Sequence, residues 1–468
     1  MNKRVLVLIA AVTCLAGGCT LAPEYTRPVA PIPEQWPRGE SYEDMAEQEG
    51  LPVQALSRQA FFGNEPLLKI IDLALENNRD LRLAALNVEK ARALYGIQRA
   101  ALFPALQATG AGAKEQRSRD LIGPGEPRTV EQYSAGLGVA AWEIDFFGRI
   151  RSLEDQALEE YLATDAARQS IRIALVSQVA TAYLTLAADR ENLNLARSTL
   201  DSQQKARDLI QRQYEVGIAT ELDLGRAEIP VETARRDVAR FTQSVALTRN
   251  ALDLLAGVTV PDDLLPKDLK TVQETGAVLP GLSSEALLFR PDIMAAEHRL
   301  KSAYAFIGAA RAAFFPRISL TTGIGTASDA LSGLFSSGTG TWNFVPQAAL
   351  PIFDARVRAA YRVSKAQRDI AVTQYEKTIQ TAFREVADAL AVQSMIDRQI
   401  AAQKTLTQAV EKTWFLAKKR YEAGIDSYLS VLDAQRSLYT QQQVLNTLLL
   451  QKRANQVQLY AVLGGGSE

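Results

Sequence analysis

The chain has 468 residues, and 52 Lys and Arg residues stand against 53 Asp and Glu residues, for a formal net charge of −1 at pH 7. This balance excludes an electrostatic case for binding nucleic acid or an anionic membrane surface. The chain has one histidine, His298, and two cysteines, Cys14 and Cys19. A histidine-based catalytic triad and a zinc cluster are therefore excluded, and no glycine-rich phosphate loop follows a strand. We predict no enzyme active site and no metal site.

Residues 1–18 have the pattern of an export signal. Lys3 and Arg4 precede an apolar run that is too short to span a membrane, and small residues follow it. Cleavage after residue 18 would leave Cys19 at the N-terminus, as in bacterial lipoproteins, where this cysteine is acylated. Thr20, rather than Asp, after the cysteine implies sorting to the outer membrane. The alternative is a plain secretory signal in which the cysteine is incidental.

The next part of the chain changes from irregular to helical. Residues 20–65 are rich in Pro, Glu and Gln and have no clear periodicity, which predicts an extended arm laid over the surface. A helical pattern then runs from Pro66 to Phe103 and stops at Pro104. The same stop recurs later, where RAAFFPRI (311–318) repeats RAALFPAL (99–106).

After each of these stops the apolar residues alternate with a period of two, which predicts half-buried strands. We expect four strands of about ten residues, in hairpins over about 105–142 and 317–351, with loops near 119–129 and 329–340. This length suits transmembrane β-strands, and Trp142 and Trp342 suit an interfacial aromatic girdle. No run of 18 apolar residues follows the signal, so a membrane crossing would use these strands. The alternative is two ordinary soluble hairpins.

Four strands cannot close a barrel, and open sheet edges are not tolerated in lipid. A membrane barrel would therefore be shared between subunits. Two copies would supply eight strands, and side chains fill the interior of an eight-stranded barrel. Three copies would supply twelve strands and leave room for a channel. The strand pattern therefore predicts at least three subunits.

Two long segments without Gly or Pro follow the hairpins, from Arg149 to Val216 and from Arg356 to Ala423. Each has 68 residues, and their starts are 207 residues apart. An uninterrupted helix of this length would reach about 100 Å. Together with the repeated proline stops, these segments indicate an internal duplication over almost the whole chain.

Each long segment ends in the same reversal. Gly217 and Gly424 supply a left-handed C-cap, and Thr220 and Ser427 follow as N-caps of a returning helix. We expect two tight helical hairpins, whose tips would ring one end of an oligomer.

On the second returning helix, Leu429, Asp433 and Arg436 have i, i+4, i+7 spacing and share one face. Repeated by symmetry, they would form rings that close a pore by apolar contact and ion pairing. The first repeat has Leu222 in the matching place, but Arg226 and Ile229 in the other two. The alternative is ordinary helix packing with a surface ion pair.

The remaining candidate catalytic groups have simpler interpretations. His298 lies in a helical pattern and is expected to be packed or solvated. Glu159 and Glu160 are adjacent on a helix and do not face each other, so we expect them to be a solvated surface.

Several of these motifs together resemble the outer membrane factors, the TolC-like exit ducts of tripartite efflux pumps. Within that family the chain is most similar to the OprM-like lipoproteins that pair with proton-driven RND pumps. The resemblance covers essentially the whole mature chain and rests on CTLAPEYTRP (19–28), LALENNRDLR (73–82), WEIDFFGRIRS (142–152), RPDIMAAEHRL (290–300), GAARAAFFPRISL (308–320) and FREVADALA (383–391).

The resemblance implies a mainly α protein: a homotrimer with a twelve-stranded barrel in the outer membrane and a twelve-helix tunnel in the periplasm. It also implies that Leu429, Asp433 and Arg436 close the periplasmic tip. An adaptor protein would open it by docking against the tip turns at Gly217, Thr220, Leu222, Gly424 and Ser427. The expected organisation is a signal peptide (1–18), a lipidated arm with an equatorial segment (19–65), a first repeat (66–256), an equatorial linker (257–282), a second repeat (283–463) and a tail (464–468).

We therefore predict a passive outer-membrane duct that conducts drugs and other amphiphilic small molecules from an inner-membrane RND pump and a periplasmic adaptor. We expect no cofactor other than the diacylglycerol and N-acyl groups on Cys19. An alternative is the same kind of duct in type I protein secretion or heavy-metal export. A second alternative is a lipoprotein scaffold of coiled coils without a pore.

Overall fold

The computed structural model describes residues 20–45, 51–52, 57–273, 276, 278–279 and 284–465. The chain divides into two compact units, each built from stretches of both repeats. Unit 1 is Met1–Val29, Asn87–Asp165 and Ala295–Tyr375, and unit 2 is Ala30–Leu86, Ala166–Met294 and Glu376–Glu468. The predicted acylation site, Cys19, lies outside the described residues.

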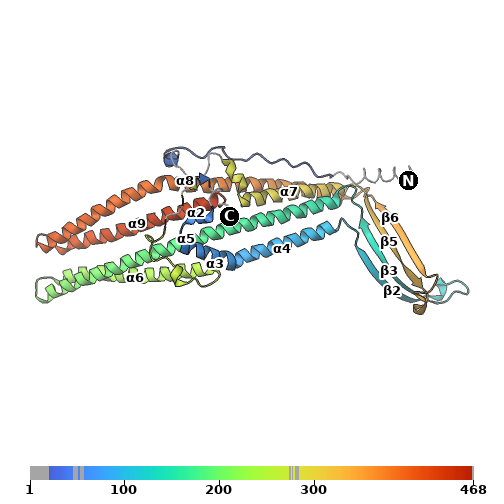
Figure 1. The fold of residues 1–468 in the computed structure, drawn as a ribbon, viewed down its shortest axis with the longest axis horizontal. Helices are drawn as coiled ribbons and strands as arrows, with labels where there is room; N and C mark the ends of the chain where they lie inside the picture. Colours follow the sequence, from blue (N-terminus) through green and yellow to red (C-terminus); the bar gives the residue numbers. More distant parts are fainter. Residues whose placement is uncertain are drawn as a thin grey trace. The chain divides into compact units, whose positions relative to one another are not determined.

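Helices make up most of the described chain, which also has a four-stranded sheet and a short two-stranded parallel sheet (Figure 1). The α-helices are α2 (Arg58–Phe62), α3 (Glu65–Asn77), α4 (Arg79–Ala100), α5 (Arg149–Glu215), α6 (Glu221–Ala256), α7 (Pro291–Ala312), α8 (Ala355–Glu422) and α9 (Tyr428–Val462). The strands are β1 (Leu51–Pro52), β2 (Leu106–Gln116), β3 (Thr129–Glu143), β4 (Val278–Leu279), β5 (Arg317–Ser328) and β6 (Gly340–Ala349). Short 3-10 helices are η1 (Glu40–Met45), η3 (Arg119–Leu121), η4 (Asp262–Leu264), η5 (Ser284–Phe289) and η6 (Leu331–Gly333).

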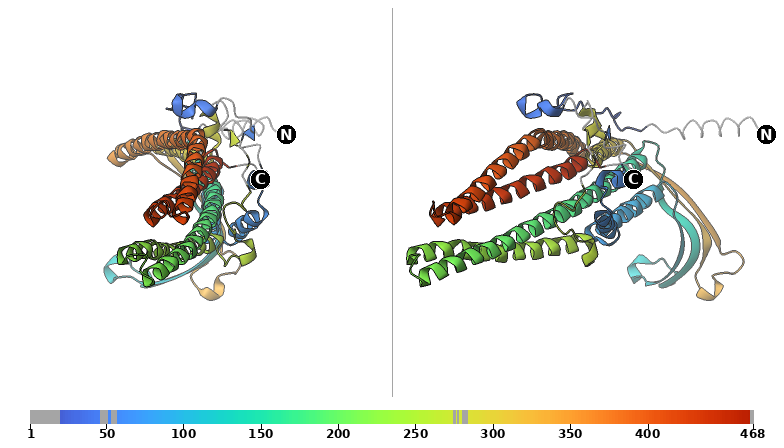
Figure 2. Two further views of the ribbon diagram at one scale, coloured as in Figure 1. Left: turned by 90° about the vertical axis from the view of Figure 1, so that its left-hand side faces the viewer. Right: turned by 60° about the vertical axis from the view of Figure 1, so that its left-hand side comes forward.

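Unit 1 contains the four predicted strands, which form one antiparallel sheet in the order β2-β3-β5-β6. The register between β3 and β5 shifts between Val139 and Trp142, where Ala141 has a φ of 50°. Such bulges bend a strand, and Figure 2 shows the sheet strongly curved. Among the described residues, nothing pairs with the outer edges of β2 and β6. Large apolar side chains are exposed on the sheet: Leu106, Leu137, Ile324, Trp342 and Phe344.

The first helical pattern is two helices rather than one, which corrects the expectation of a continuous segment from Pro66. Asn78 separates α3 from α4 because its side chain is used as a cap. Its Oδ1 accepts a hydrogen bond from the Leu81 amide at 2.9 Å, and its Nδ2 donates to the Leu255 carbonyl at 3.0 Å. At this break, the side chain of Asn78 therefore links the start of α4 to the end of α6.

The helical part of unit 2 contains both hairpins. The hairpin of α5 and α6 lies beside the hairpin of α8 and α9 (Figure 2), and Ser202 Oγ accepts a hydrogen bond from Gln435 Nε2 at 3.2 Å. The predicted long helices are confirmed, with 67 residues in α5 and 68 in α8. One 18-residue stretch of α5 is apolar enough to cross a membrane, and 56% of it is buried within the protein. That degree of burial is typical of a core helix.

The N-terminal arm is fastened rather than merely laid over the surface. In unit 1, Glu297 accepts hydrogen bonds from Tyr25 Oη at 3.0 Å and from Arg27 Nη2 at 2.7 Å. Lys301 Nζ lies 3.4 Å from the same carboxylate, whose side chain is only 8% exposed. In unit 2, Trp36 stacks on Phe383 with ring centroids 5.2 Å apart. The arm also contains the short helix α2, which the sequence did not predict.

We expect Glu297→Gln to loosen the arm because the substitution removes the charge that holds Arg27. Burial by itself raises the pKa of Glu297, but Arg27, Lys301 and Tyr25 outweigh it and hold the pKa below its ordinary value of 4.5. This contribution to stability is therefore present above pH 4.5 and is lost as the pH falls through the lowered pKa.

Limited proteolysis at neutral pH measures the effect. Cleavage of the arm should be at least several-fold faster in Glu297→Gln than in the wild type, and the two rates should converge in acid. Equal rates at neutral pH would contradict the assignment. Glu411→Gln is the control, because it removes an acid from an exposed position of α8, far along the helix from Phe383.

Candidate functional site

The first tip, between α5 and α6, has the predicted geometry. Gly217 has a φ of 80°, and its amide donates to the Tyr214 carbonyl at 2.9 Å. Thr220 caps α6 by accepting a hydrogen bond from the Asp223 amide at 3.2 Å. Asp223 Oδ2 in return accepts from the Thr220 amide at 3.0 Å, which completes a capping box. The hydrogen bonds with Thr220 lower the pKa of Asp223.

The second tip, between α8 and α9, differs in one detail. Gly424 has a φ of 71° and donates its amide to the Tyr421 carbonyl at 2.9 Å. Ser427 occupies the predicted N-cap position, but its hydroxyl makes no capping hydrogen bond. The Ser430 amide donates instead to the Ser427 carbonyl, at 3.2 Å. An ion pair joins Arg420 to Asp426 across the turn.

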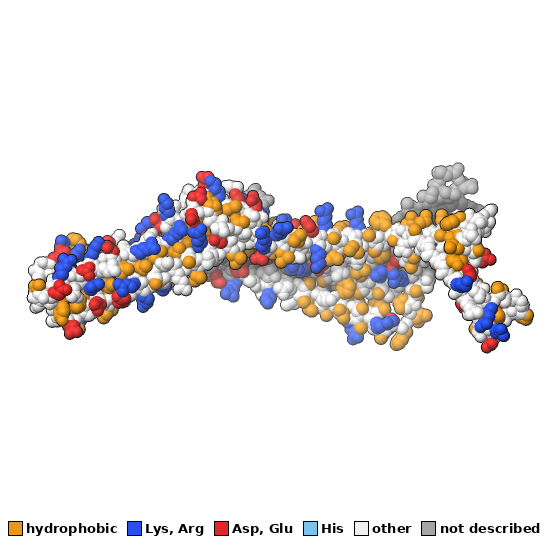
Figure 3. Space-filling view, turned by 90° about the horizontal axis from the view of Figure 1, so that it is seen from below, with side chains coloured by type: hydrophobic (Ala, Val, Ile, Leu, Met, Phe, Trp, Pro, Cys, Tyr) orange, Lys and Arg blue, Asp and Glu red, His pale blue; other side chains and the backbone are white. Residues whose placement is uncertain are grey.

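Both tips expose apolar side chains. Val216, Ile218 and Leu222 are exposed at the first tip, and Ile425 is exposed at the second. Acidic and basic side chains are interspersed at this end of the helices (Figure 3). Such a mixture of apolar and alternating charged groups is suited to contact with another protein.

The three predicted gate residues lie together on α9 and line a groove against α6. The groove has a volume of about 190 Å³. Leu429, Asp433 and Arg436 form one wall, and Arg226 and Ile229 of the first repeat form part of the other. The groove therefore brings the three residues of the second repeat beside two residues at matching positions of the first repeat, whereas Leu222 is not among the described lining residues.

Asp433 is paired within its own helix. Arg436 Nη2 donates to Asp433 Oδ1 at 3.1 Å, and the two side chains are 79% and 58% exposed. An exposed pair of this kind contributes little to the stability of one chain. Its charges stay available to groups outside the chain.

Tyr439 and Asp237 form a polar link that the sequence analysis missed. Tyr439, on α9, donates its hydroxyl to Asp237 Oδ2 of α6 at 3.2 Å. Burial and the nearby Asp237 carboxylate raise the pKa of Tyr439 to about 12. Asp237 is buried within an apolar stripe of α6 that includes Ala234 and Phe241. This link could have been inferred from the sequence, because Asp237 is an acidic residue at an otherwise apolar position of the helical pattern.

A second polar link joins the ends of the two long helices. Tyr421 Oη donates to Gln213 Oε1 at 3.1 Å. With the link between Tyr439 and Asp237, it holds the two hairpins together close to their tips. A relative displacement of the hairpins would have to break both of these hydrogen bonds and the one between Gln435 and Ser202.

His298 is packed against an acid. The prediction of a solvated surface is wrong for Glu159, which is half-buried, but Glu160 is exposed as predicted. His298 Nδ1 lies 2.6 Å from Glu159 Oε2, and Ser302 Oγ donates to Glu160 Oε1 at 2.9 Å. Both glutamates therefore join α5 to α7, although Glu160 stays exposed to solvent. Their i, i+1 spacing still allows both to reach α7 because α7 lies along that side of α5.

Within the described part of the chain, no group of three potential ligands from His, Cys, Asp and Glu could hold a metal ion.

The family model for the outer membrane efflux protein matches residues 70–258 and 282–465. The chain belongs to the family of outer membrane efflux proteins. Both matched stretches contain a hairpin of the sheet, a long helix and a tip, as the duplication predicts. The predicted family is therefore confirmed.

The chain is similar to members of this family over almost its full length. It is 46% identical to the solvent efflux pump outer membrane protein SrpC of Pseudomonas putida, over 97% of this chain and 96% of SrpC. A membrane protein crystal structure from Pseudomonas aeruginosa has 40% identity and a TM-score of 0.88, over 96% of this chain and 98% of that one. The open state of the Neisseria gonorrhoeae MtrE outer membrane channel has 35% identity and a TM-score of 0.85, over the same shares. These similarities confirm the predicted fold class and place the protein in the outer membrane.

Proposed function

We propose that the protein is the passive outer-membrane exit duct of a tripartite efflux system. The observation that carries this proposal is a curved four-stranded sheet with two open edges, in a chain whose two helical hairpins end in matching tips. The chain would act without chemistry of its own, because energy and most of the selectivity would come from an inner-membrane RND pump. Its cargo would be drugs and other amphiphilic small molecules.

The working unit would be a homotrimer. Edges β2 and β6 of three copies would pair with one another to close a twelve-stranded barrel, since an open edge is costly in lipid. The exposed Leu106, Ile324 and Trp342 suit an outward face toward lipid. Two hairpins from each of three copies would form the twelve-helix periplasmic tunnel.

The groove residues Leu429, Asp433 and Arg436 would line the periplasmic opening of the tunnel. Three-fold symmetry would bring three copies of the exposed ion pair toward one axis. An Arg436 side chain could then exchange its partner for the Asp433 of a neighbouring copy. Rings of this kind can narrow a pore and set its ion preference.

The apolar side chains at the tips would receive a periplasmic adaptor protein. Leu222 lies in the first turn of α6, close to Gly217 and Thr220, and Ile425 lies beside Gly424 and Ser427. Because the left-handed glycines keep both turns tight, an adaptor would meet the same compact shape six times around a trimer. Docking there could separate the hairpins by breaking the hydrogen bonds of Tyr421 and Tyr439.

Acylation of Cys19 would add a second attachment to the outer membrane. We expect Cys19→Ser to lose the mass of the diacylglycerol and N-acyl groups and to remain trimeric, because the barrel and not the lipid would hold the subunits together. Mass spectrometry of the intact protein, followed by native mass measurement of the oligomer, checks both parts. An unchanged mass would contradict lipidation, and a monomer would contradict assembly through the barrel.

Conductance in a planar lipid bilayer tests the duct itself. The purified protein should form small channels that are closed most of the time. A coiled-coil scaffold would give no conductance, and this result would exclude the proposal. Type I secretion or heavy-metal export would use the same channel, so the choice among cargoes needs an assay in cells.

A further inference from the structure

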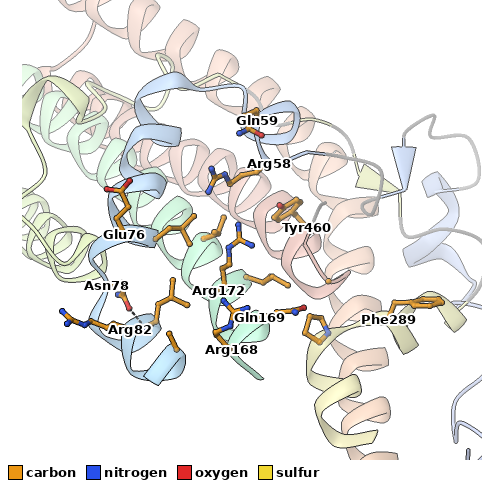
Figure 4. Close-up of a pocket in the computed structure, with 17 residues that line it drawn as sticks. Arg58, Gln59, Glu76, Asn78, Arg82, Arg168, Gln169, Arg172, Phe289 and Tyr460 are labelled. Atoms are coloured by element: carbon orange, nitrogen blue, oxygen red, sulfur yellow. Dashed lines mark hydrogen bonds between the residues drawn. The ribbon is translucent and has the colours of Figure 1, made fainter. Parts of the chain in front are cut away.

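A cavity of about 880 Å³ opens in unit 2, away from the tips and the groove (Figure 4). Its walls come from α2, from the junction of α3 and α4, and from the first half of α5. The start of α7 and the end of α9 complete it through Pro291 and Tyr460. The volume is large enough for a small organic ligand.

The lining of this cavity is strongly basic, although the whole chain is nearly neutral. Arg58, Arg82, Arg168 and Arg172 line it, whereas Glu76 is the single carboxylate among the described lining residues. Figure 4 shows Arg58 on α2 and Arg168 and Arg172 on α5 around the same space. Positive charge is therefore concentrated in a concave, partly desolvated site.

Arg58 has unused hydrogen-bonding capacity in this cavity. Its Nη2 donates to Asp72 Oδ1 at 2.6 Å, but its buried Nη1 has no hydrogen-bond partner among the described residues. The side chain is only 19% exposed. Buried donors without a partner are rare in native proteins, which indicates that a further acceptor belongs beside this atom.

Mutual repulsion among the arginines supports the same conclusion. Burial and the positive charges of Arg58 and Arg168 lower the pKa of the Arg172 guanidinium. An anion between these groups would relieve the repulsion. Guanidinium groups bind carboxylates and phosphates through two parallel hydrogen bonds, which makes these anions the best matched in geometry.

We propose that this cavity is a binding site for an anionic ligand that carries at least two carboxylate or phosphate groups. Arg58 and Arg172 would contact one anionic group, and Arg168 or Arg82 another. The apolar side chains of Leu75, Ile173 and Val176, which also line the cavity, would contact the carbon skeleton of the ligand. Because the cavity shares no lining residue with the groove, ligand binding there does not require the proposed duct function.

Isothermal titration of the full-length purified protein with inorganic pyrophosphate tests the proposal. The wild type should bind pyrophosphate saturably, at one site per chain. The variant R58Q/R172Q should bind at least about tenfold more weakly, because each charged hydrogen bond contributes on the order of 1.5 kcal/mol or more. The control R235Q/R384Q removes the same charge at exposed positions outside the cavity and should bind as the wild type does.

Two results would overturn the site: no saturable binding by the wild type, or equal binding by R58Q/R172Q and the wild type. If R58Q/R172Q does not fold, R172K tests the site instead, because lysine keeps the positive charge but lacks the planar guanidinium group that forms two parallel hydrogen bonds. Its affinity should fall several-fold, and an unchanged affinity would equally overturn the site. A parallel titration with a short-chain diacylglycerol pyrophosphate distinguishes a lipid headgroup from a free anion as the natural ligand. Tighter binding than that of pyrophosphate would identify a lipid headgroup, and weaker binding would identify a free anion.

Discussion

Replacing Asp433 by alanine is expected to increase the current through the channel several-fold in a planar bilayer. Among the described residues of one chain, Asp433 forms only an exposed ion pair with Arg436, at 3.1 Å. Around a three-fold axis the same charges would meet in a ring, and loss of the acid would leave three arginines that repel one another. The opening should therefore widen, while the stability of each chain changes little.

Glu232→Ala is a matched control for this prediction. Glu232 forms an exposed i, i+3 ion pair with Arg235 on α6, in the same unit, but does not line the groove. Its loss should leave the current unchanged. If Asp433→Ala and Glu232→Ala conducted alike, the assignment of Asp433 to the gate would be wrong.

Replacing Gly257 by alanine is expected to have the largest effect on stability. Gly257 ends α6 with a φ of 71°, and a Cβ atom there would overlap the Asn77 carbonyl oxygen. The neighbouring atom belongs to the backbone at the end of α3, so no side chain can turn away. Left-handed strain and displacement of α3 together should lower the free energy of unfolding by about 3 kcal/mol or more.

Thermal unfolding of the purified protein, followed by circular dichroism, measures this effect. Gly225→Ala is the control, because Gly225 lies in the same helix and, apart from the neighbouring helix backbone, no atom of the described residues comes within 4 Å of the added Cβ. It should raise the stability by about 0.5 to 1 kcal/mol, as expected when alanine replaces glycine in a helix. Equal midpoints for the two variants would refute the close approach of α6 to α3.

The regular features of the fold could be predicted from the sequence because they depend on local signals. The absence of Gly and Pro over 68 residues predicts a long helix, and Gly217 and Gly424 mark where each helix reverses. Alternating apolar residues predict the strands, although not the bulge near Ala141. These signals depend on the backbone preferences of neighbouring residues.

Features that depend on residues far apart in the chain could not be predicted in this way. Asn78 interrupts a good helical pattern because it binds the carbonyl of Leu255, far along the chain. Glu159 forms a contact with His298 that its own helix does not reveal. The groove is an intermediate case, since spacing places Leu429, Asp433 and Arg436 on one face, whereas only the fold brings Arg226 opposite them.

Drug susceptibility in a deletion strain of the native host, complemented by the wild-type chain, tests the central claim most directly. The account predicts that the deletion strain is hypersensitive to several unrelated amphiphilic drugs and retains more of a fluorescent dye. Complementation should reverse both effects. A strain with unchanged susceptibility to these drugs, and with loss of a secreted polypeptide or sensitivity to a single metal, would contradict a multidrug efflux duct.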